Sequence, residues 1–320
     1  MRIVFMGTPD FAVNSLKALI SAGHEVAAVV TQPDRPKGRG HKLTPPPVKV
    51  AAGEAGLKVL QPEKIKTPEF TALLQELSPE LIVVAAFGQL LSREILELPL
   101  HGCINVHASL LPKYRGAAPI HWAVINGESA TGVTIMQMDE GLDTGDMILS
   151  GRVPITAEDT TGTVHDRLAQ MGAELLVKGV ELISAGRAQR VAQRHDQATY
   201  APLLNKDIEK INWQRSSFDI FNLVRGLNPW PVAYTLLGGS VLKIWSVRAC
   251  TIDRIPGPIP ELANHQPGEV LGRIPEVGFA IAVGNGCIAV TEVQLQGSRR
   301  MNAEEFMRGR HLDKGTILGE

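Results

Sequence analysis

The stretch RIVFMGTPDFAVNSLKALISAGHEVAAVVT, residues 2–31, holds the pattern that sets the fold. Residues 2–6 form a short apolar run that predicts a buried strand, and GTPD at residues 7–10 predicts a turn that starts a helix. Apolar residues at helical spacing carry that helix to Gly23, and residues 26–31 predict a second strand. A strand, a helix and a further strand indicate one β-α-β unit of a parallel sheet.

The same alternation continues along the first part of the chain. It predicts a helix over 69–77, strands at 83–87, 103–107 and 133–138, and a long helix over 160–185. Short, continuously apolar strands are typical of a sheet that is covered on both faces. We therefore expect an α/β fold with a Rossmann-like, doubly wound, mostly parallel sheet, in which ligands bind beyond the carboxyl ends of the strands.

The glycine turn at residues 7–12, GTPDFA, does not complete the dinucleotide-binding fingerprint. It lacks the second and third glycines, and a proline stands where the backbone would approach a pyrophosphate. A tight strand-to-helix turn is therefore favoured over an NAD site.

The pattern changes after residue 185. Residues 186–210 are polar and weakly periodic, which indicates a linker. A helix over 218–225 and short strands near 232–237, 241–247, 279–283 and 288–295 follow, separated by glycine and proline turns. We expect an α/β domain over 1–188, a linker over 189–208, and a small OB-like β-barrel over 209–320.

Composition excludes several classes of protein. The formal net charge of −1 gives no overall attraction to nucleic acid or membranes, and 44% hydrophobic with 20% charged residues is typical of globular chains. Cys103, Cys250 and Cys287 are too widely spaced for a disulfide framework or a zinc site. The apolar runs are too short for a signal peptide or a membrane span. We expect a soluble, cytoplasmic protein.

The segment CINVHASLLPKYRGAAP, Cys103–Pro119, contains the candidate chemistry. Strand alternation places Asn105 and His107 on one face at the strand's end. Asp143 lies in the later loop DEGLDTGD, residues 139–146. If the loops meet, Asp143 would orient His107 and favour its charged form, while an amide beside an imidazole suits a developing oxyanion.

Simpler interpretations of these residues stay open. A histidine at a strand end is often structural, and Asp143 can cap amides of its own turn. The spacing of the acidic residues in that loop does not follow the EF-hand pattern, which disfavours calcium. No partnered nucleophile accompanies the three residues, so the attacking group is expected to come from a substrate.

Four segments in order carry a family resemblance: GTPDFA (7–12), TQPDRPKGRGHKLTPPPVK (31–49), INVHASLLPKYRGAAPI (104–120) and TGVTIMQMDEGLDTGD (131–146). Together they resemble the 10-formyltetrahydrofolate-dependent formyltransferases. The resemblance spans most of residues 1–190 and continues through NPWP at 228–231. It implies the formyltransferase fold, 10-formyltetrahydrofolate as co-substrate, and no metal.

The resemblance also implies roles for single residues. Asn105, His107 and Asp143 would be catalytic, with Asn105 and protonated His107 holding the formyl oxygen as it gains negative charge, a contribution of about 3–4 kcal/mol per donor. The folate-binding set would comprise Ser109, Leu110, Leu111, Pro112, Phe87, Gln89, Leu91 and Asp139.

A basic loop over residues 32–42 suggests the acceptor. Alone it could be a solvated loop. In the branch of the family that this chain resembles, the equivalent segment meets the acceptor end of initiator methionyl-tRNA. The candidate tRNA contacts are Arg35, Lys37, Arg39 and Lys42, with Lys206 in the predicted linker. We expect formyl transfer to the α-amino group of the tRNA-bound methionine by a monomer.

Two other functions remain as alternatives. One is formyl transfer to a small amine, either glycinamide ribonucleotide or an amino sugar. The other is a folate-binding module without catalysis. The C-terminal domain and the basic loop favour tRNA over a small amine.

Overall fold

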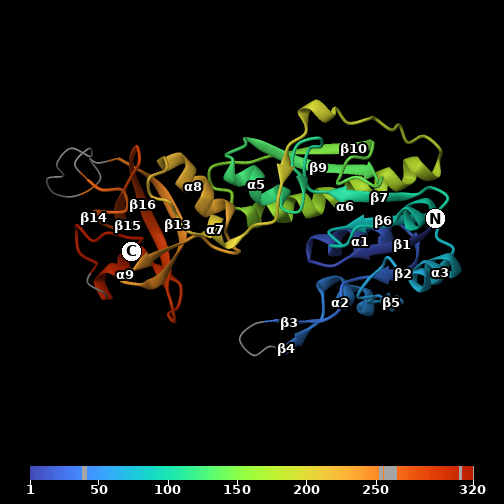
Figure 1. The fold of residues 1–320 in the computed structure, drawn as a ribbon, viewed down its shortest axis with the longest axis horizontal. Helices are drawn as coiled ribbons and strands as arrows, with labels where there is room; N and C mark the ends of the chain where they lie inside the picture. The colour runs from blue at the N-terminus through green and yellow to red at the C-terminus, as the bar shows by residue number, and fades with distance from the viewer. Residues whose placement is uncertain (38–41, 252–254, 256–264, 310–311, 320) are drawn as a thin grey trace. The chain divides into compact units, whose positions relative to one another are not determined.

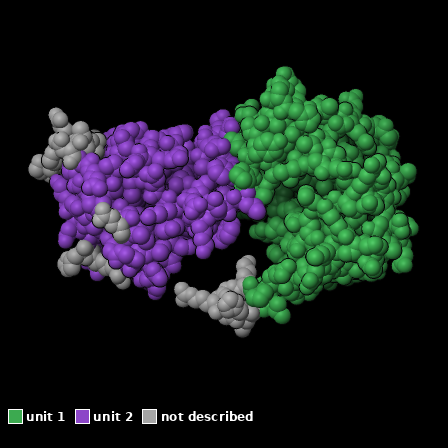
Figure 2. All heavy atoms as spheres, in the orientation of Figure 1, with its two compact units in different colours: residues 1–119, 130–154, 164–202 green, residues 120–129, 155–163, 203–320 purple. Residues whose placement is uncertain are grey.

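The computed structural model describes residues 1–37, 42–251, 255, 265–309 and 312–319 (Figure 1). The chain divides into two compact units, coloured separately in Figure 2. Unit 1 comprises Met1–Pro119, Ala130–Pro154 and Val164–Pro202, and unit 2 comprises Ile120–Ser129, Ile155–Thr163 and Leu203–Glu320.

Unit 1 contains a seven-stranded sheet in the order β10-β9-β7-β6-β1-β2-β5 (Figure 1). Its strands are β1 (Arg2–Gly7), β2 (Glu25–Val30), β5 (Val59–Leu60), β6 (Leu81–Ala85), β7 (Cys103–His107), β9 (Ala130–Gln137) and β10 (Met147–Pro154). The five strands from β7 to β5 pair in parallel, whereas β9 runs antiparallel to β7 and β10 antiparallel to β9. The predicted mostly parallel, Rossmann-like sheet is confirmed, with an antiparallel edge that the sequence did not reveal.

The helices of unit 1 begin where their sequences supply caps and apolar stripes. They are α1 (Phe11–Ser21), α2 (Pro47–Glu54), α3 (Pro68–Leu77), α4 (Arg93–Glu97) and most of α6 (Thr161–Ser184). Asp10 caps α1, and Thr67 Oγ1 accepts a hydrogen bond from Phe70 N at the start of α3. Leu16 and Leu19 of α1 are fully buried, as expected for a helix that covers a sheet.

Two short pairings lie outside the main sheet of unit 1. Strands β3 (Arg35–Lys37) and β4 (Lys42–Thr44) form an antiparallel hairpin that projects from the unit (Figure 1). Strands β8 (Arg115–Gly116) and β11 (Tyr200–Ala201) pair in parallel. Val191 also bridges Met147 of β10. Much of the segment predicted as a linker therefore packs into unit 1.

Unit 2 is built on a six-stranded sheet that is antiparallel throughout. The pairing order is β12-β13-β16-β15-β14, with β17 added to β16. The strands are β12 (Tyr234–Leu237), β13 (Ser240–Cys250), β14 (Val270–Ile274), β15 (Gly278–Val283), β16 (Gly286–Leu295) and β17 (Met301–Asn302). The small C-terminal β-domain is confirmed. Strands β14 and β17 had not been predicted, because both are short and carry little periodicity.

The helices of unit 2 pack against this sheet. They are α5 (Pro119–Ile125), α7 (Lys206–Glu209), α8 (Ser217–Gly226) and α9 (Ala303–Gly309). Ile220 and Val224 of α8 join Phe279 and Ile288 of the sheet in one hydrophobic core. None of the helices within the described ranges combines the length and the apolarity that crossing a membrane requires.

Candidate active site

Strand β7 presents two polar side chains at the centre of the unit 1 sheet. It pairs with β6 on one side and β9 on the other, so its direction and its exit point are fixed by two neighbours. Asn105 and His107 are two residues apart and share a face, as the alternation predicted. The His107 side chain is 5% exposed, and Asn105 is half-buried. Both side chains therefore sit at the carboxyl end of a strand that is held on both sides.

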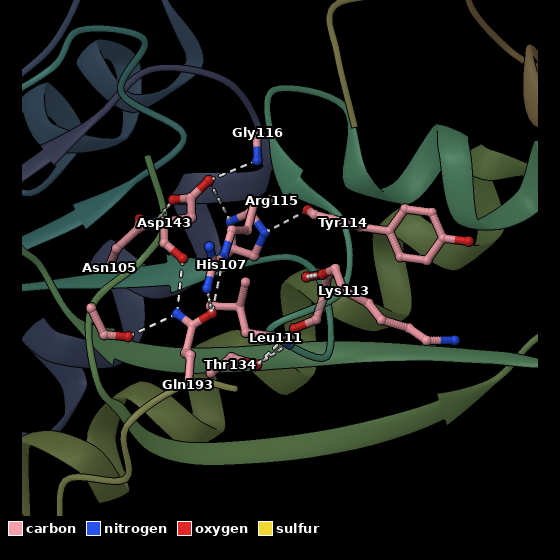
Figure 3. Close-up of polar contacts among 12 residues, drawn as sticks. Asn105, His107, Leu111, Lys113, Tyr114, Arg115, Gly116, Thr134, Asp143 and Gln193 are labelled. Carbon is pink, nitrogen blue, oxygen red and sulfur yellow. Dashed lines mark hydrogen bonds and ion pairs between the residues drawn. The ribbon is translucent and has the colours of Figure 1, made fainter. Parts of the chain in front are cut away.

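Asp143, in the loop between β9 and β10, meets both residues (Figure 3). Its Oδ2 accepts a hydrogen bond from Gly116 N at 2.8 Å and lies 3.6 Å from His107 Nδ1. Its Oδ1 lies 3.5 Å from Asn105 Nδ2, a long contact. The structure thus brings the three predicted catalytic side chains into one cluster.

The two ring nitrogens of His107 face different partners. Nε2 lies 3.0 Å from Tyr114 O, and a carbonyl oxygen can only accept, so Nε2 carries hydrogen. The other nitrogen, Nδ1, faces the Asp143 carboxylate. A proton on Nδ1 turns this approach into an ion pair in a largely buried setting. Nε2 is therefore committed to the Tyr114 carbonyl, and Nδ1 is the ring nitrogen that faces Asp143.

The loop that carries Asp143 has a tightly determined backbone. Asp143 adopts φ 53°, a left-handed conformation that aspartate tolerates better than most residues. Gly145 has no room for a side chain, because an added Cβ would lie 1.8 Å from Gln137 O. Asp139 accepts hydrogen bonds from Gly141 N and Thr144 Oγ1, so this exposed carboxylate closes the turn.

Sequence reasoning missed two buried polar residues beside the cluster, Arg115 and Gln193. Arg115 is 2% exposed and is among the largest fully buried side chains. Its Nη2 donates to Gln193 Oε1 at 2.7 Å, and Gln193 Nε2 donates to the backbone oxygens of Asp143 and Gly145 (Figure 3). A charged residue inside the apolar 108–119 segment was a usable signal for Arg115. Gln193 lies in a polar segment without periodicity, which gave no signal.

Residues 109–112, SLLP, form a loop that is held in place by hydrogen bonds. Ser109 Oγ donates to Lys113 O, and Leu111 N donates to Thr134 Oγ1. Ser109 and Leu111 are buried, whereas Leu110 and Pro112 are partly exposed.

The predicted folate residues that follow β6 offer less side-chain surface to a ligand than the SLLP loop does. Phe87 and Leu91 pack in the hydrophobic core of unit 1, so their side chains do not line an open surface. The amide of Gln89 contacts Ile65 N and Glu63 O. Leu90, in the loop after β6, and Leu142, in the loop after β9, are exposed apolar side chains.

The predicted tRNA contacts fall in two places. Arg35 and Lys37 lie in β3 and Lys42 in β4, while Arg39 lies outside the described residues. Lys206 is exposed at the start of α7 in unit 2. Beside the hairpin, hydrogen bonds from Gln61 and from Lys49 lower the pKa of the Asp34 carboxyl. The one acid of the basic loop is therefore locally neutralised by Lys49, at 2.8 Å.

Within the described residues, no three side chains of His, Cys, Asp or Glu lie together as a metal ion would need.

Comparison with known proteins identifies the family. The family described as "Formyl transferase" matches residues 1–180, and "Formyl transferase, C-terminal domain" matches 203–311. A methionyl-tRNA formyltransferase of Pelotomaculum thermopropionicum is 58% identical over 322 residues, covering 100% of this chain and 99% of the relative. A second, from Desulforamulus reducens, is 56% identical over 319 residues, covering 100% and 98%.

Solved structures agree on the fold. The N-formyltransferase from Helicobacter canadensis, in complex with folinic acid and dTDP-3-aminofucose, gives a TM-score of 0.64 at 22% identity, covering 90% of this chain and 98% of that one. HypX from Aquifex aeolicus, in complex with tetrahydrofolic acid, gives 0.62 at 17% identity, covering 96% and 47%. This chain belongs to the methionyl-tRNA formyltransferase family, as the sequence resemblance predicted.

Proposed function

We propose that this chain transfers the formyl group of 10-formyltetrahydrofolate to the α-amino group of methionine on initiator methionyl-tRNA. The observation that carries the proposal is the meeting of Asn105, His107 and Asp143 at the end of β7. Full-length relatives at 58% and 56% identity, both named methionyl-tRNA formyltransferase, support the choice of acceptor.

The residues around this cluster fit a folate. The loops that follow β6 and β9 each expose a leucine, Leu90 and Leu142, and apolar surface of this kind suits a flat ring system. The partly exposed Leu110 and Pro112 of the SLLP loop follow the end of β7. We assign the ring-binding surface to these loops, with Ser109, Leu111, Phe87, Gln89, Leu91 and Asp139 shaping it through backbone and packing.

When bound, 10-formyltetrahydrofolate supplies an electrophilic formyl carbon. Asn105 has two amide N–H groups, and its long contact with Asp143 uses one of them, so the other is available to a developing oxyanion. Preorganised donors of this kind contribute about 3–4 kcal/mol each. The attacking amine loses a proton as its bond to the formyl carbon forms, and N10 of the folate gains one as its bond to that carbon breaks. His107 and Asp143, through Nδ1 and the carboxylate that faces it, would move this proton.

We assign the tRNA acceptor end to Arg35, Lys37, Arg39 and Lys42, with Lys206 as a further contact. The hairpin β3–β4 presents the first part of this set, and Arg35 is exposed. In this scheme residues 1–188 are catalytic, 189–208 link, and 209–320 bind tRNA. Translation initiation takes place in the cytoplasm, which locates the proposed activity there. We further propose that the chain acts as a monomer.

The test is incubation with 10-formyltetrahydrofolate labelled in the formyl group. Four acceptors are compared: methionyl initiator tRNA, the same tRNA uncharged, glycinamide ribonucleotide, and a nucleotide-linked amino sugar. Formyl-methionine released from the charged tRNA alone is the expected result. Label on either small amine would replace the proposed acceptor, and folate binding without transfer to any acceptor would reduce the chain to a binding module.

A further inference from the structure

Resting on the formyl-transfer function proposed above, we propose that Gln193 is a positioning residue for the catalytic cluster. It holds the backbone of the Asp143 loop so that the carboxylate faces His107. Gln193 belongs to residues 191–201, which we call the strap. The strap follows α6 and lies where the sequence predicted a linker.

The amide of Gln193 uses all of its hydrogen-bonding capacity. Its Oε1 accepts from Nε and Nη2 of Arg115 at 3.1 and 2.7 Å, and its Nε2 donates to the backbone oxygens of Asp143 and Gly145, both at 2.8 Å. Guanidinium nitrogens only donate and carbonyl oxygens only accept, so the amide has one possible orientation. With 5% of the side chain exposed, water cannot readily replace these bonds.

The two carbonyls that Gln193 holds flank the critical turn. They belong to Asp143, at φ 53°, and to Gly145, which has no space for a Cβ. Fixing both carbonyls sets the direction in which the Asp143 side chain leaves the backbone. That direction brings Oδ2 to 2.8 Å from Gly116 N and 3.6 Å from His107 Nδ1.

The strap also forms hydrogen bonds with residues 114–117, which contact both His107 and Asp143. Thr199 accepts hydrogen bonds from Tyr114 N at its Oγ1 and from Arg115 N at its carbonyl, and Ala201 O accepts from Ala117 N. These bonds fix Tyr114, whose carbonyl meets His107 Nε2, and strand β8, in which Gly116 N donates to Asp143 Oδ2. One segment therefore orients both members of the His107–Asp143 pair.

A purely structural role makes a different prediction from a positioning role. If Gln193 served only to compensate the buried Arg115 charge, glutamate would serve as well or better, because Arg–carboxylate pairs are strong. Glutamate has no N–H, however, and would place a carboxylate oxygen against the carbonyls of Asp143 and Gly145. The substitution Gln193→Glu thus keeps the Arg115 contact and abolishes the hold on the loop.

The experiment compares Gln193→Glu with the matched control Gln197→Glu, an exposed glutamine of the same strap. We expect Gln193→Glu to lower kcat by about 10–100-fold, the scale of a small misplacement of catalytic groups, with KM for the folate and for methionyl-tRNA within about threefold. The kcat–pH profile should shift as well, because the carboxylate facing His107 moves. The control should match the wild type in kcat, KM and pH profile.

Two further measurements keep the outcome clear. If Gln193→Glu folds poorly, Gln193→Met takes its place. Methionine keeps the volume but bonds neither Arg115 nor the loop carbonyls, and we expect the same loss of kcat. NMR titration of the His107 ring reports the His107–Asp143 geometry without any acceptor, so it tests positioning even if the proposed acceptor is wrong. Wild-type kcat together with an unchanged His107 titration in Gln193→Glu would overturn the proposal.

Discussion

In the proposed reaction, Asn105, His107 and Asp143 would divide the chemistry among an amide, an imidazole and a carboxylate. Asn105 keeps an amide N–H beyond its contact with Asp143, whereas His107 commits Nε2 to Tyr114 O and turns Nδ1 toward Asp143. This refines the expectation from sequence, in which both residues were assigned to the formyl oxygen. Donation from Asn105 and proton exchange at His107 are separable roles, so substitutions at the two positions should differ in their pH dependence.

Replacing Asn105 by alanine tests the donor role. We expect Asn105→Ala to lower kcat by roughly 10²–10³-fold, the cost of losing one oxyanion donor, with little change in KM for the folate. Steady-state kinetics with methionyl-tRNA provide the measurement. The control is Asn14→Ala on α1, which should behave as wild type. Equal losses in turnover and in folate affinity would contradict an oxyanion role.

Burial makes the Cys103 thiol a weaker acid than an exposed thiol. It lies on β7 two residues before Asn105, and burial raises the pKa of its thiol from 9.0 to about 12. The unfolded chain therefore releases this proton first as the pH rises. Cys103 contributes stability that is complete below pH 9.0 and is lost as the pH approaches about 12.

The thiol should accordingly be inert in the folded protein. We expect iodoacetamide at pH 8 to leave Cys103 unmodified while it alkylates the half-exposed Cys250, because the thiolate is the reactive form. Mass spectrometry of the cysteine peptides gives the extent at each site, with denatured protein as the control. Rapid alkylation of Cys103 in the native state would show that this end of β7 opens to solvent.

At the scale of the element, the loop between β9 and β10 has a conformation with several strict requirements. Its conformation depends on φ 53° at Asp143, on the turn closed by Asp139, and on the absence of a side chain at Gly145. Both flanking strands are antiparallel additions to the parallel sheet. Because β9 is antiparallel to β7, it ends with Gln137 opposite Ile104, so the loop leaves the sheet at the amino end of β7. The fold of the loop itself then brings Asp143 to Asn105 and His107.

Gly145→Ala tests that dependence. A Cβ would lie 1.8 Å from Gln137 O, so the backbone must move and carry Asp143 with it. We expect kcat to fall by about 10²-fold, as for other misplaced catalytic groups. Gly53→Ala is the matched control, since Gly53 lies in α2 with nothing within 4 Å of its added Cβ, and it should retain full activity. Near-normal turnover in Gly145→Ala would show that the loop adapts.

At the scale of the whole molecule, the chain has to attract a polyanion without an excess of positive charge. Its net charge is −1, so local arrangement must supply the attraction. The hairpin β3–β4 concentrates cations, and Lys49 pairs with the single acid beside it. Each phosphate contact adds to the salt dependence of binding through counterion release.

Neutralising a hairpin cation should therefore flatten that dependence. We expect Arg35→Ala to reduce the slope of log K against log salt for methionyl-tRNA by about 0.7–0.9, the value for one phosphate contact. Binding titrations over a range of salt concentrations provide the slope, and Lys17→Ala on α1 supplies a control of equal charge change. A slope equal to that of the wild type would remove Arg35 from the tRNA contacts.

Local sequence predicted several elements closely and picked out the three candidate catalytic residues, whose roles stay a prediction. Strand β7 begins and ends where predicted, at Cys103–His107, because its apolar run and polar end are both local signals. Helix α8 spans Ser217–Gly226 against a predicted 218–225, since its amphipathic stripe is equally local. The antiparallel edge formed by β9 and β10 could not be inferred, because strand direction depends on partners far away in the chain.

The sequence by itself determined the alternation of strands and helices, the polar end of β7, and the family, since these depend on residue type and spacing. Only the tertiary structure decided that Asp143 meets His107, that His107 turns Nδ1 toward this carboxylate, and that Gln193 links Arg115 to the backbone of the loop. The strap shows the reason. A polar segment without periodicity carries no local signal, and its hydrogen bonds join residues far apart in the chain, such as Tyr114 and Thr199, which are 85 positions apart.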